Sequence, residues 1–382
     1  MKEPTLKKCI VVTCFSEGQP GFLDFSYRIR AIAAHYQLTV VSTSPLIQAE
    51  LQFPGANYVV IDGGKGRVGW LRYLWRCACL IRKQKPSVAV LLHSMSAPLA
   101  MMVGPIPTIT YWNEHPMHVA PEPSGISPIR ALMRRLVRWA MFQGARRSSL
   151  VMPIGEAHRD DLLLHGCDPG QTRMFYMGVE KTFAGVALSG SRREEGAPLR
   201  LIYVGSVHKD RGRDVMLEAM AIANQQSKIA HLTIVGADAE QSEFCHGALR
   251  KLGIMNSVTI HGRVPGHLIP NFMKEADAGL CLWEDLPWCR FNPPTKLFEY
   301  LMAGLPVLAS NIRTHTQYLS DGQNGLIFEY DSGSLARAIS VLWEGRSGLS
   351  GFKRRAFESG MPFLWERIEP LFLEAVGAVA TK

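Results

Sequence analysis

Residues 291–310, FNPPTKLFEYLMAGLPVLAS, hold the pattern that decides the fold of this chain. The two prolines exclude a helix interior, so they predict a rigid loop that releases the chain into a helix at Thr295, the expected N-cap. Apolar residues at helical spacing follow, Gly304 ends the helix, and residues 305–309 are typical of a short buried strand. The stretch therefore predicts a loop, a helix and a strand in succession.

The first turn of this helix carries Lys296 and Glu299, one turn apart. Backbone N–H groups at a helix start lack partners within the helix and favour an anion, so a phosphate beside Lys296 suits this corner. Glu299 can accept hydrogen bonds from two vicinal sugar hydroxyls. Taken alone, such a pair is more often an ordinary surface ion pair, so the context must decide.

The rest of the chain repeats an order of strand, loop and helix. The expected strands are residues 9–14, 38–41, 58–61, 88–92, 107–111, 150–154, 173–177, 201–205, 232–236, 258–260 and 278–282. Repeated βα units predict parallel sheets that are covered by helices on both faces. The fold class is therefore α/β, with doubly wound, Rossmann-like parallel sheets.

A length of 382 residues is too great for one ordinary core and predicts two domains. Residues 185–198 are small, polar and unpatterned, so they are the expected linker between a domain at 1–184 and a domain at 199–345. Ligands of open parallel sheets bind at the carboxyl ends of the strands. We therefore expect one cleft between the two domains, lined by the loops that follow the strands, at 15–21, 111–118, 205–212, 262–266 and 283–296.

The composition excludes several classes of protein. Hydrophobic residues make up 47% of the chain and charged residues 20%, which indicates a globular protein. The eight cysteines show no CxxC pair and no Cys/His spacing for a metal, which favours a reduced cytosolic chain. Neither a signal peptide nor a membrane span is expected, because the apolar runs are short or broken by prolines.

Several short motifs, in this order and at these separations, resemble the retaining GT-B-fold glycosyltransferases of the group 1 type. Members of that family transfer sugars from nucleotide donors during polysaccharide and glycolipid synthesis. The resemblance covers nearly the whole chain and rests on residues 93–94, 154–156, 177–180, 204–206, 211–212, 294–300 and 303–307. It strengthens the functional interpretation of Lys296 and Glu299.

The resemblance implies an acceptor-binding first domain, a nucleotide-sugar-binding second domain, and helices at 346–382 that return to the first domain. Arg211 would bind the donor diphosphate, Glu299 the ribose hydroxyls, and Arg263 with Val264 would pack on the base. The implied donor-binding residues are Gly205, Ser206, Arg211, Arg263, Val264, Pro294, Thr295, Lys296, Leu297 and Glu299. The implied acceptor-side loop carries Glu17, Gly18 and Gly21. No metal and no cofactor is expected, since no DxD triplet is present.

By the same resemblance, His115 would face the donor sugar and donate to a hydroxyl. Glu114 is the alternative for this catalytic position, because a one-residue shift of the loop exchanges the two. One position departs from the family, which commonly carries a Glu where this chain has Phe291. Sugar contacts would then come from the backbone of 291–295 or from Glu284 and Asp285, and a UDP- or GDP-sugar remains the expected donor.

The excess of positive over negative charge lies entirely in the first half of the chain, and two segments concentrate it. Residues 1–190 contain 21 Lys and Arg against 12 Asp and Glu, whereas residues 191–382 contain 21 of each. Aromatic and aliphatic residues alternate with arginines in 67–85 and 129–147, as in helices that lie on anionic membranes. The expected membrane-facing residues are Trp70, Arg72, Trp75, Arg76, Arg130, Arg134, Arg135 and Arg138. The alternative is an ordinary solvated basic face; nucleic acid is not expected, since no recognised module is present.

Together these observations predict a cytoplasmic glycosyltransferase, a hexosyltransferase, that is peripheral on the inner face of the plasma membrane. It would transfer one sugar with retention to a polyprenyl-diphosphate-linked or growing saccharide, in exopolysaccharide, O-antigen or glycolipid assembly. The alternatives are a non-catalytic scaffold with the same fold, a nucleotide-sugar epimerase, or a phosphorylase, which would need a pyridoxal lysine.

Overall fold

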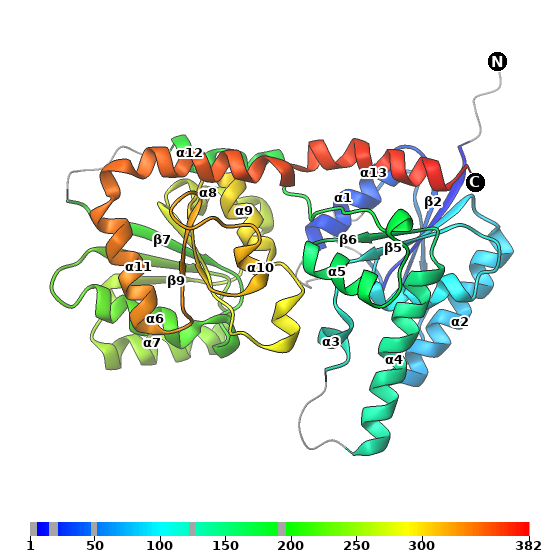
Figure 1. Ribbon diagram of the computed structural model, residues 1–382, viewed down its shortest axis with the longest axis horizontal. Coiled ribbons are helices and arrows are strands. Elements are labelled where there is room, and N and C mark those ends of the chain that lie inside the picture. The colour runs from blue at the N-terminus through cyan, green and yellow to red at the C-terminus, as the bar shows by residue number, and fades with distance from the viewer. Residues whose placement is uncertain (1–5, 15–21, 47–51, 122–126, 190–195, 382) are drawn as a thin grey trace. The chain divides into compact units, whose positions relative to one another are not determined.

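The computed structural model describes residues 6–14, 22–46, 52–121, 127–189 and 196–381. The chain forms two compact units (Figure 1). The first unit, which we call the N-domain, comprises residues 1–178 and 365–382, and the second, the C-domain, comprises residues 179–364. The chain therefore passes between the units twice, after Gly178 and after Leu364.

The N-domain is built on a six-stranded parallel sheet with the order β3-β2-β1-β4-β5-β6. Its strands are β1 (Lys8–Val12), β2 (Gln37–Ser42), β3 (Asn57–Val60), β4 (Val88–Leu91), β5 (Thr108–Trp112) and β6 (Leu150–Pro153). Its helices are α1 (Phe22–Ala33), α2 (Gly66–Gln84), the 3-10 helix η2 (Ser94–Met101), α3 (Pro116–Val119), α4 (Pro128–Arg147), α5 (Glu156–Leu164) and α13 (Trp365–Val379). The central strands are buried except for Lys8 at the start of β1, which explains their mostly apolar sequences.

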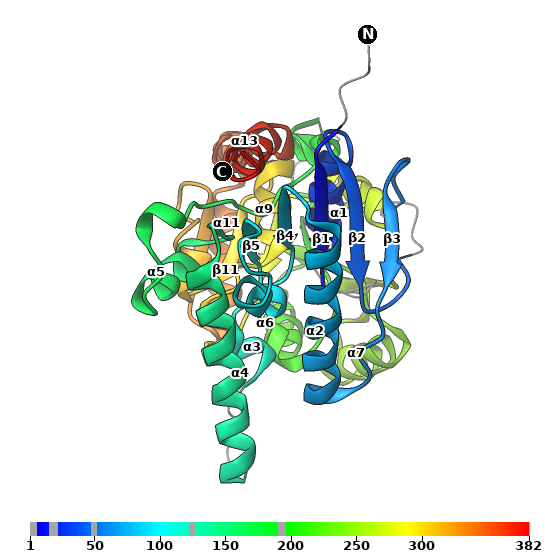
Figure 2. The ribbon, with the colours of Figure 1, turned by 90° about the vertical axis from the view of Figure 1, so that its right-hand side faces the viewer.

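Helices cover both faces of this sheet (Figure 2). On one face, α2 and η2 pack in a cluster of buried apolar residues that includes Ile10, Val12 and Leu91. Elsewhere, α13 packs along α1, where the rings of Tyr27 and Trp365 lie 5.7 Å apart. The last helix of the chain therefore completes the N-domain.

Arg28 on α1 is fully buried and joins three segments of the N-domain. Its guanidinium forms an ion pair with Asp24 at 3.2 Å and donates to the hydroxyl of Tyr111 and the carbonyl of Tyr176, each at 2.9 Å. The Asp24 carboxylate also accepts from the N–H of Gly178 at 2.8 Å. Burial of these charges is compensated by their mutual contacts, so the cluster fixes α1, β5 and residues 176–178 together.

The C-domain repeats the same plan with a second six-stranded parallel sheet, ordered β12-β11-β10-β7-β8-β9. Its strands are β7 (Leu199–Val204), β8 (Ala230–Val235), β9 (Val258–His261), β10 (Ala278–Cys281), β11 (Val307–Ser310) and β12 (Gly325–Phe328). Its helices are α6 (Arg213–Ala223), α7 (Ala239–Leu252), α8 (Ile269–Lys274), α9 (Thr295–Ala303), α10 (Arg313–Thr316), α11 (Ser332–Glu344) and α12 (Leu349–Gly360). The prediction of two doubly wound parallel-sheet domains is confirmed.

In each sheet the strand order reverses between two central strands, and such switch points are where open sheets bind ligands. The switch lies between β1 and β4 in the N-domain and between β7 and β10 in the C-domain. Helix α9 packs over the second switch because Gly279 on β10 has no side chain; a Cβ there would lie 2.4 Å from the Tyr300 ring. The Tyr300 hydroxyl in turn accepts from the N–H of Val204 at 2.8 Å, which fixes α9 against β7.

The observed elements differ from the sequence expectations at several points. Residues 173–177 form no strand; the N–H groups of Arg173 and Phe175 only bond to carbonyls at the edge of β6, at 3.0 Å each. Strand β12 was not predicted, because its four residues show no pattern of their own. The units divide at 178/179 and 364/365, so residues 179–184 and α12 lie with the C-domain. Of the expected linker, residues 190–195 lie outside the described residues, and 186–189 form a 3-10 turn of the C-domain.

Candidate active site in the C-domain

Helix α9 presents Lys296 in its first turn and Glu299 three residues later, at the carboxyl ends of the central strands. Pro294, not Thr295, is the N-cap, and no side chain caps the helix. Thr295 is instead the first helical residue, because the fixed φ of the preceding proline already gives the extended conformation that a cap requires. The observed arrangement of loop, helix and terminating glycine otherwise agrees with the expectation, and Gly304 is in the left-handed conformation.

Lys296 is half-buried and lies close to the end of β7. Its Nζ lies 3.7 Å from the centre of the Tyr203 ring, and a Cβ on Gly205 would lie 3.2 Å from the same nitrogen. Gly205 has φ 124°, a conformation that other residues rarely adopt, so the glycine permits both the turn and this close approach. Burial lowers the pKa of Lys296 to about 7, and nearby Arg211 lowers it further, against Cys281 and Glu299, which raise it.

Glu299 shares this environment. Burial raises the pKa of its carboxyl to about 7, although the positive charge of Lys296 acts in the opposite direction. In the described part of the chain, neither Lys296 nor Glu299 has a side-chain hydrogen bond or an ion pair within 4 Å. A base and an acid are therefore held side by side with their charges largely unsatisfied.

Arg211 supplies a second cation at the same switch point. Its guanidinium lies over the ring of Trp283, 4.5 Å from the ring centre, in the loop that follows β10. Trp283 is held by Ser310 at the end of β11. The backbone N–H of Trp283 donates to the Ser310 hydroxyl at 3.0 Å, and that hydroxyl donates to the Trp283 carbonyl at 2.8 Å. The platform under Arg211 is thus fixed from two strands.

His315 completes this support. One ring nitrogen lies 3.0 Å from the Ser310 carbonyl and the other 3.5 Å from the Cys281 sulfur. The pKa of His315 is lowered to about 4, chiefly by burial and also by the nearby cations Lys296 and Arg211, against the hydrogen bond to Ser310, which raises it. Sequence reasoning missed Trp283, Ser310 and His315; the only signal was their place directly after predicted strands.

The other expected donor-binding residues are distributed around this centre. The carbonyl of Ser206 accepts from the Tyr203 hydroxyl at 2.9 Å. The loop of Arg263 and Val264 adjoins Gly236, whose N–H donates to Gly262 at 3.2 Å and whose Cα region abuts Gly205. The glycine-rich ends of β7, β8 and β9 therefore lie next to one another, as the sequence order of the loops predicts.

Two of the residues that were expected to bind the donor are not exposed. Pro294 and Leu297 are buried, and Leu297 belongs to the core rather than to a binding surface. Asp285 is paired with Arg290 at 2.7 Å, whereas Glu284 is exposed. Of these two candidates for sugar contacts, only Glu284 has its carboxylate uncommitted to Arg290.

His115 lies in the N-domain, in the loop that follows β5. It is buried, its Nδ1 accepts from the N–H of Met117 at 3.1 Å, and its Nε2 lies 2.9 Å from the carboxylate of Asp161 on α5. Glu114 is bonded to His118 one turn on. Both side chains are therefore committed within their own loop and α5, because the loop after β5 turns at once into α3 with His115 as its N-cap. Glu17, Gly18 and Gly21 lie outside the described residues.

The basic helices also differ in detail from the expectation. On α4, Arg134 and Arg138 turn towards the domain and donate to the carbonyls of Pro121 and Ala120. The exposed side chains on its opposite face are apolar: Ile129, Leu132, Met133, Leu136 and Trp139. On α2, Arg72 and Arg76 reach the carbonyls of residues 63 and 62, Trp70 is half-buried, and Trp75 is 60% exposed. Arg130 and Arg135 are exposed.

Two further observations concern metals and membranes. Across the described ranges, no three or more His, Cys, Asp or Glu side chains gather as they would around a metal ion. Within the same ranges, no helix combines the length and the apolar character needed to cross a bilayer.

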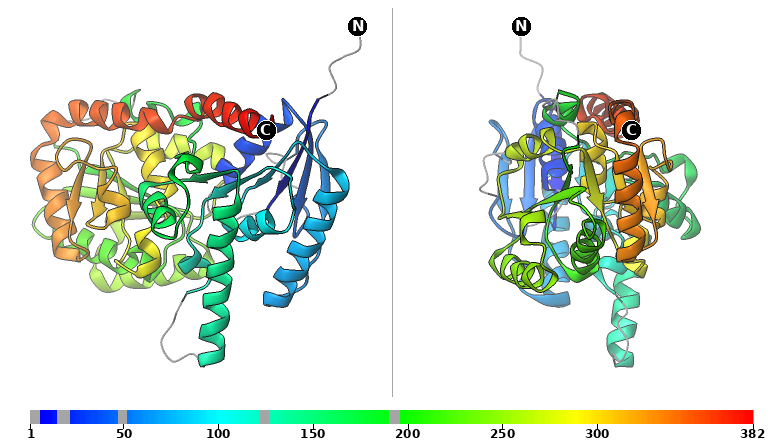
Figure 3. Two further views of the ribbon diagram at one scale, coloured as in Figure 1. Left: turned by 45° about the vertical axis from the view of Figure 1, so that its right-hand side comes forward. Right: turned by 90° about the vertical axis from the view of Figure 1, so that its left-hand side faces the viewer.

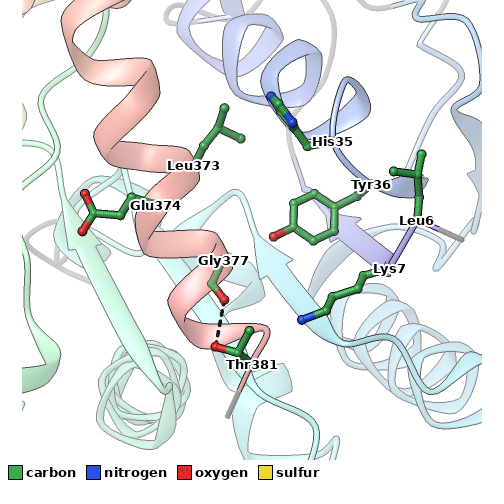
Figure 4. A pocket seen from close by; sticks show the side chains of 8 residues that line it. All are labelled: Leu6, Lys7, His35, Tyr36, Leu373, Glu374, Gly377 and Thr381. Atoms are coloured by element: carbon green, nitrogen blue, oxygen red, sulfur yellow. Dashed lines mark hydrogen bonds between the residues drawn. The ribbon is translucent and has the colours of Figure 1, made fainter. Parts of the chain in front are cut away.

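A cavity of about 550 Å³ lies at the amino ends of β1 and β2 in the N-domain sheet (Figure 4). It is lined on one side by Lys7 and Tyr36, which come just before β1 and β2, and on the other by Leu373 and Gly377 of α13. Parallel sheets bind their ligands at the carboxyl ends of their strands, so this cavity lies at the opposite end of the strands.

Comparison with known proteins gives a family match within the C-domain. Residues 198–345 match the family described as Glycosyl transferases group 1. The chain is 26% identical over 181 residues to spore coat protein SA of Bacillus subtilis (strain 168), covering 44% of this chain and 46% of that protein. It is 28% identical over 120 residues to the UDP-glycosyltransferase TURAN of Arabidopsis thaliana, covering 29% and 25%. The matched segments span less than half of either relative.

Solved structures match over nearly the whole chain. HepE of Anabaena, in complex with UDP and glucose, superimposes with a TM-score of 0.73 at 15% identity, covering 97% of this chain and 99% of HepE. WaaG, a glycosyltransferase involved in lipopolysaccharide biosynthesis, gives 0.71 at 16% identity, covering 95% and 99%. The fold is therefore that of the GT-B glycosyltransferases, which confirms the fold that the resemblance implied, whereas the retaining character stays a prediction.

Proposed function

From the group 1 glycosyltransferase domain at residues 198–345, we propose that this chain transfers a sugar from a nucleotide-diphosphate donor to a saccharide acceptor. UDP is the first nucleotide to test, because HepE is described in complex with UDP and TURAN is named a UDP-glycosyltransferase. We further propose that the sugar keeps its anomeric configuration and that the acceptor is a lipid-linked or growing saccharide in exopolysaccharide, O-antigen or glycolipid assembly.

The observation that carries this proposal is the pair of unsatisfied cations at the C-domain switch point. Lys296 and Arg211 approach the same strand ends, and the start of α9 beside them has no side-chain cap. A nucleoside diphosphate would supply the negative charge that this corner lacks, and its ribose would supply hydroxyls for Glu299. Burial, which makes the empty site costly, strengthens each of these contacts once the ligand is bound.

The chemistry follows from the position of these charges. When the bond between the sugar and the diphosphate breaks, negative charge grows on the departing phosphate. Lys296 and Arg211 are already oriented there, so they stabilise the transition state without reorganisation. With retention, the departing phosphate itself accepts the proton of the attacking hydroxyl on the same face of the sugar, and no protein nucleophile is required.

One observation favours a second candidate, a non-catalytic scaffold. Phe291 stands where the family commonly carries a sugar-binding Glu, and Asp285 nearby is already paired with Arg290. A scaffold would bind the nucleotide through Lys296 and Arg211 but would not turn it over.

The test is a panel of UDP-, GDP- and ADP-sugars, scored by thermal shift and by slow release of free sugar. Glu299→Ala is compared with Glu344→Ala, an exposed control at the end of α11. We expect one nucleotide class to stabilise the wild type and the control but not Glu299→Ala, and sugar to be released. Stabilisation without release favours the scaffold, and no response to any nucleotide contradicts the proposal.

We also propose that the protein associates with the inner face of the plasma membrane. The exposed apolar side chains of α4 recur at positions 129, 132, 133, 136 and 139, which places them on one face of the helix. Arg130 and Arg135 flank that face, as in helices that lie at an anionic bilayer surface. Co-sedimentation with anionic vesicles is expected to fall for Leu132→Ser and Leu136→Ser; unchanged binding would contradict this placement.

A further inference from the structure

A second cavity lies in the N-domain between α2 and α4, near the carboxyl end of β4. Its volume is about 330 Å³, which is within the range of ligand pockets. Figure 3 shows α2 and α4 flanking the region of η2, against which both helices pack. The cavity is lined by Gly66, Arg67, Trp70, Met95, Val119, Ala120, Pro121, Arg134 and Val137.

The lining has a distinct chemistry: apolar walls and two cations. Arg67 comes from the first turn of α2 and Arg134 from α4, and none of the described residues that line the cavity carries a carboxylate. The indole N–H of Trp70 donates to the Met95 carbonyl at 3.1 Å, so its ring is fixed and adds only apolar surface to the wall. Val119 and Val137 add further apolar surface. A ligand that suits these walls is both anionic and apolar.

The location also favours a ligand. Met95 lies in η2, directly after β4, and the strand order of the N-domain sheet reverses between β1 and β4. The cavity is therefore beside the switch point, at the edge where the strands end.

We propose that this cavity binds the phosphate end of an isoprenyl phosphate or diphosphate. The phosphate oxygens would lie between Arg67 and Arg134, and the first isoprene units would lie against Trp70 and Val137. A volume of about 330 Å³ holds only this part of a long lipid, so the remaining chain would lie outside the cavity. The inference rests on the proposed function in one respect, because the bound lipid is taken to be the carrier of the acceptor saccharide.

The experiment uses the full chain, without membranes, and three probes: geranyl diphosphate, inorganic pyrophosphate and geraniol. Binding is followed by thermal shift and by tryptophan fluorescence, since Trp70 lines the cavity. We expect geranyl diphosphate to bind at least about tenfold more tightly than either fragment, because charge and apolar contact act together. Equal binding of pyrophosphate would overturn the inference and indicate a plain anion patch.

Two variants separate the two contributions. Arg67→Met removes one cation and is expected to weaken geranyl diphosphate at least about tenfold, whereas Val137→Trp fills the cavity and is expected to abolish the response without changing charge. Lys83→Met, which removes a charge from the exposed end of α2, is the control and should bind as the wild type does. Unchanged binding in both Arg67→Met and Val137→Trp would overturn the inference.

A parallel assay of nucleotide-sugar hydrolysis distinguishes a failure of the lipid-phosphate site from a failure of the proposed function. If the nucleotide-sugar is hydrolysed but geranyl diphosphate does not bind, the inference fails and the proposed function stands. If geranyl diphosphate binds in the cavity but no nucleotide-sugar binds, the lipid-phosphate site stands and the proposed function fails.

Discussion

The two domains share one strand order but treat their inner charges in opposite ways. In the N-domain, Arg28 and Asp24 are buried against each other, and the guanidinium lies 4.2 Å from the Tyr111 ring centre and 5.3 Å from that of Trp365. In the C-domain, Lys296 and Glu299 are held near each other with no ion pair or side-chain hydrogen bond to any described residue. The difference teaches that charges satisfied by the protein hold the fold, whereas charges left unsatisfied at a switch point bind a ligand.

The pKa values express the same contrast. Burial moves the pKa of both Lys296 and Glu299 to about 7, so each group is displaced towards its neutral form. Such a displacement lowers the free energy of unfolding, and it is typical of sites where the binding of a ligand offsets this loss. The account therefore predicts different consequences for substitutions in the two clusters.

The largest effect on stability is expected for Asp24→Asn. The change leaves the buried Arg28 without its counter-charge, so the free energy of unfolding of the N-domain should fall by about 3–5 kcal/mol. Urea unfolding followed by tryptophan fluorescence measures it. Asp160→Asn, in an exposed pair with Arg159, is the control and should cost less than about 1 kcal/mol. If the two variants are equally stable, the buried pair is not what fixes the N-domain.

Lys296→Met should produce the largest loss of activity with no loss of stability. Removing a cation that stabilises the departing phosphate is expected to lower sugar release about 100- to 1000-fold. The free energy of unfolding should stay equal or rise, because methionine fills the same space without a desolvated charge. Lys251→Met on the exposed face of α7 is the control for charge. A variant that loses stability but keeps its activity would reverse the assignment.

The pH dependence of stability sharpens the comparison further. The pKa of Lys296 is about 7 in the folded state against an ordinary value of 10.5, so the unfolded state binds more protons between these values. Its contribution to the free energy of unfolding therefore rises with pH from about 7 to about 10. The difference between wild type and Lys296→Met, measured by urea unfolding, should rise over that window. A flat difference would mean that Lys296 is not desolvated.

Glu299 gives the opposite sign in a lower window. Its pKa is raised from 4.5 to about 7 on folding, so the folded state binds more protons between these values. Its contribution to stability is present below pH 4.5 and is lost as the pH rises through 7. The difference between wild type and Glu299→Gln should fall over that range; a rise would show that the carboxylate is stabilised in the folded state.

The smallest effect is expected for Trp283→Leu. Loss of the ring under Arg211 removes a cation–π contact of about 0.5–2 kcal/mol, so UDP binding should weaken about 3- to 30-fold. Trp343→Leu is a matched control, since Arg346 lies 4.0 Å from the centre of that ring but on exposed surface outside the site. Equal affinity in the two variants would remove Trp283 from the donor site.

The sequence predicts most of the fold because the strands are buried and short-range signals delimit them. The helix at α9, its glycine stop and the parallel βα order all follow from local pattern. Residues 173–177 show why this fails at an edge: their apolar residues read as a strand, yet they bond to β6 only at isolated points. Strand β12 was missed for the converse reason, since an edge strand needs little sequence pattern.

The site is predictable only in part, since side-chain direction depends on tertiary contacts. The sequence places Lys296 and Arg211 near strand ends because their motifs are local. His115 was expected to face a sugar, yet Asp161, 46 positions later, holds its ring. Likewise the helical wheel of α4 places its arginines on one face but does not reveal that Arg134 and Arg138 face the domain.

The central claim is tested most directly by the stabilisation that UDP gives to three proteins: wild type, Asp24→Asn and Lys296→Met. Urea unfolding is measured for each with and without saturating UDP, since a ligand that binds only the folded state raises its stability. The account predicts that Asp24→Asn is less stable but keeps the gain from UDP, and that Lys296→Met keeps its stability but loses the gain. If UDP stabilises Lys296→Met as much as it stabilises the wild type, the unsatisfied charges of the C-domain are not a nucleotide site.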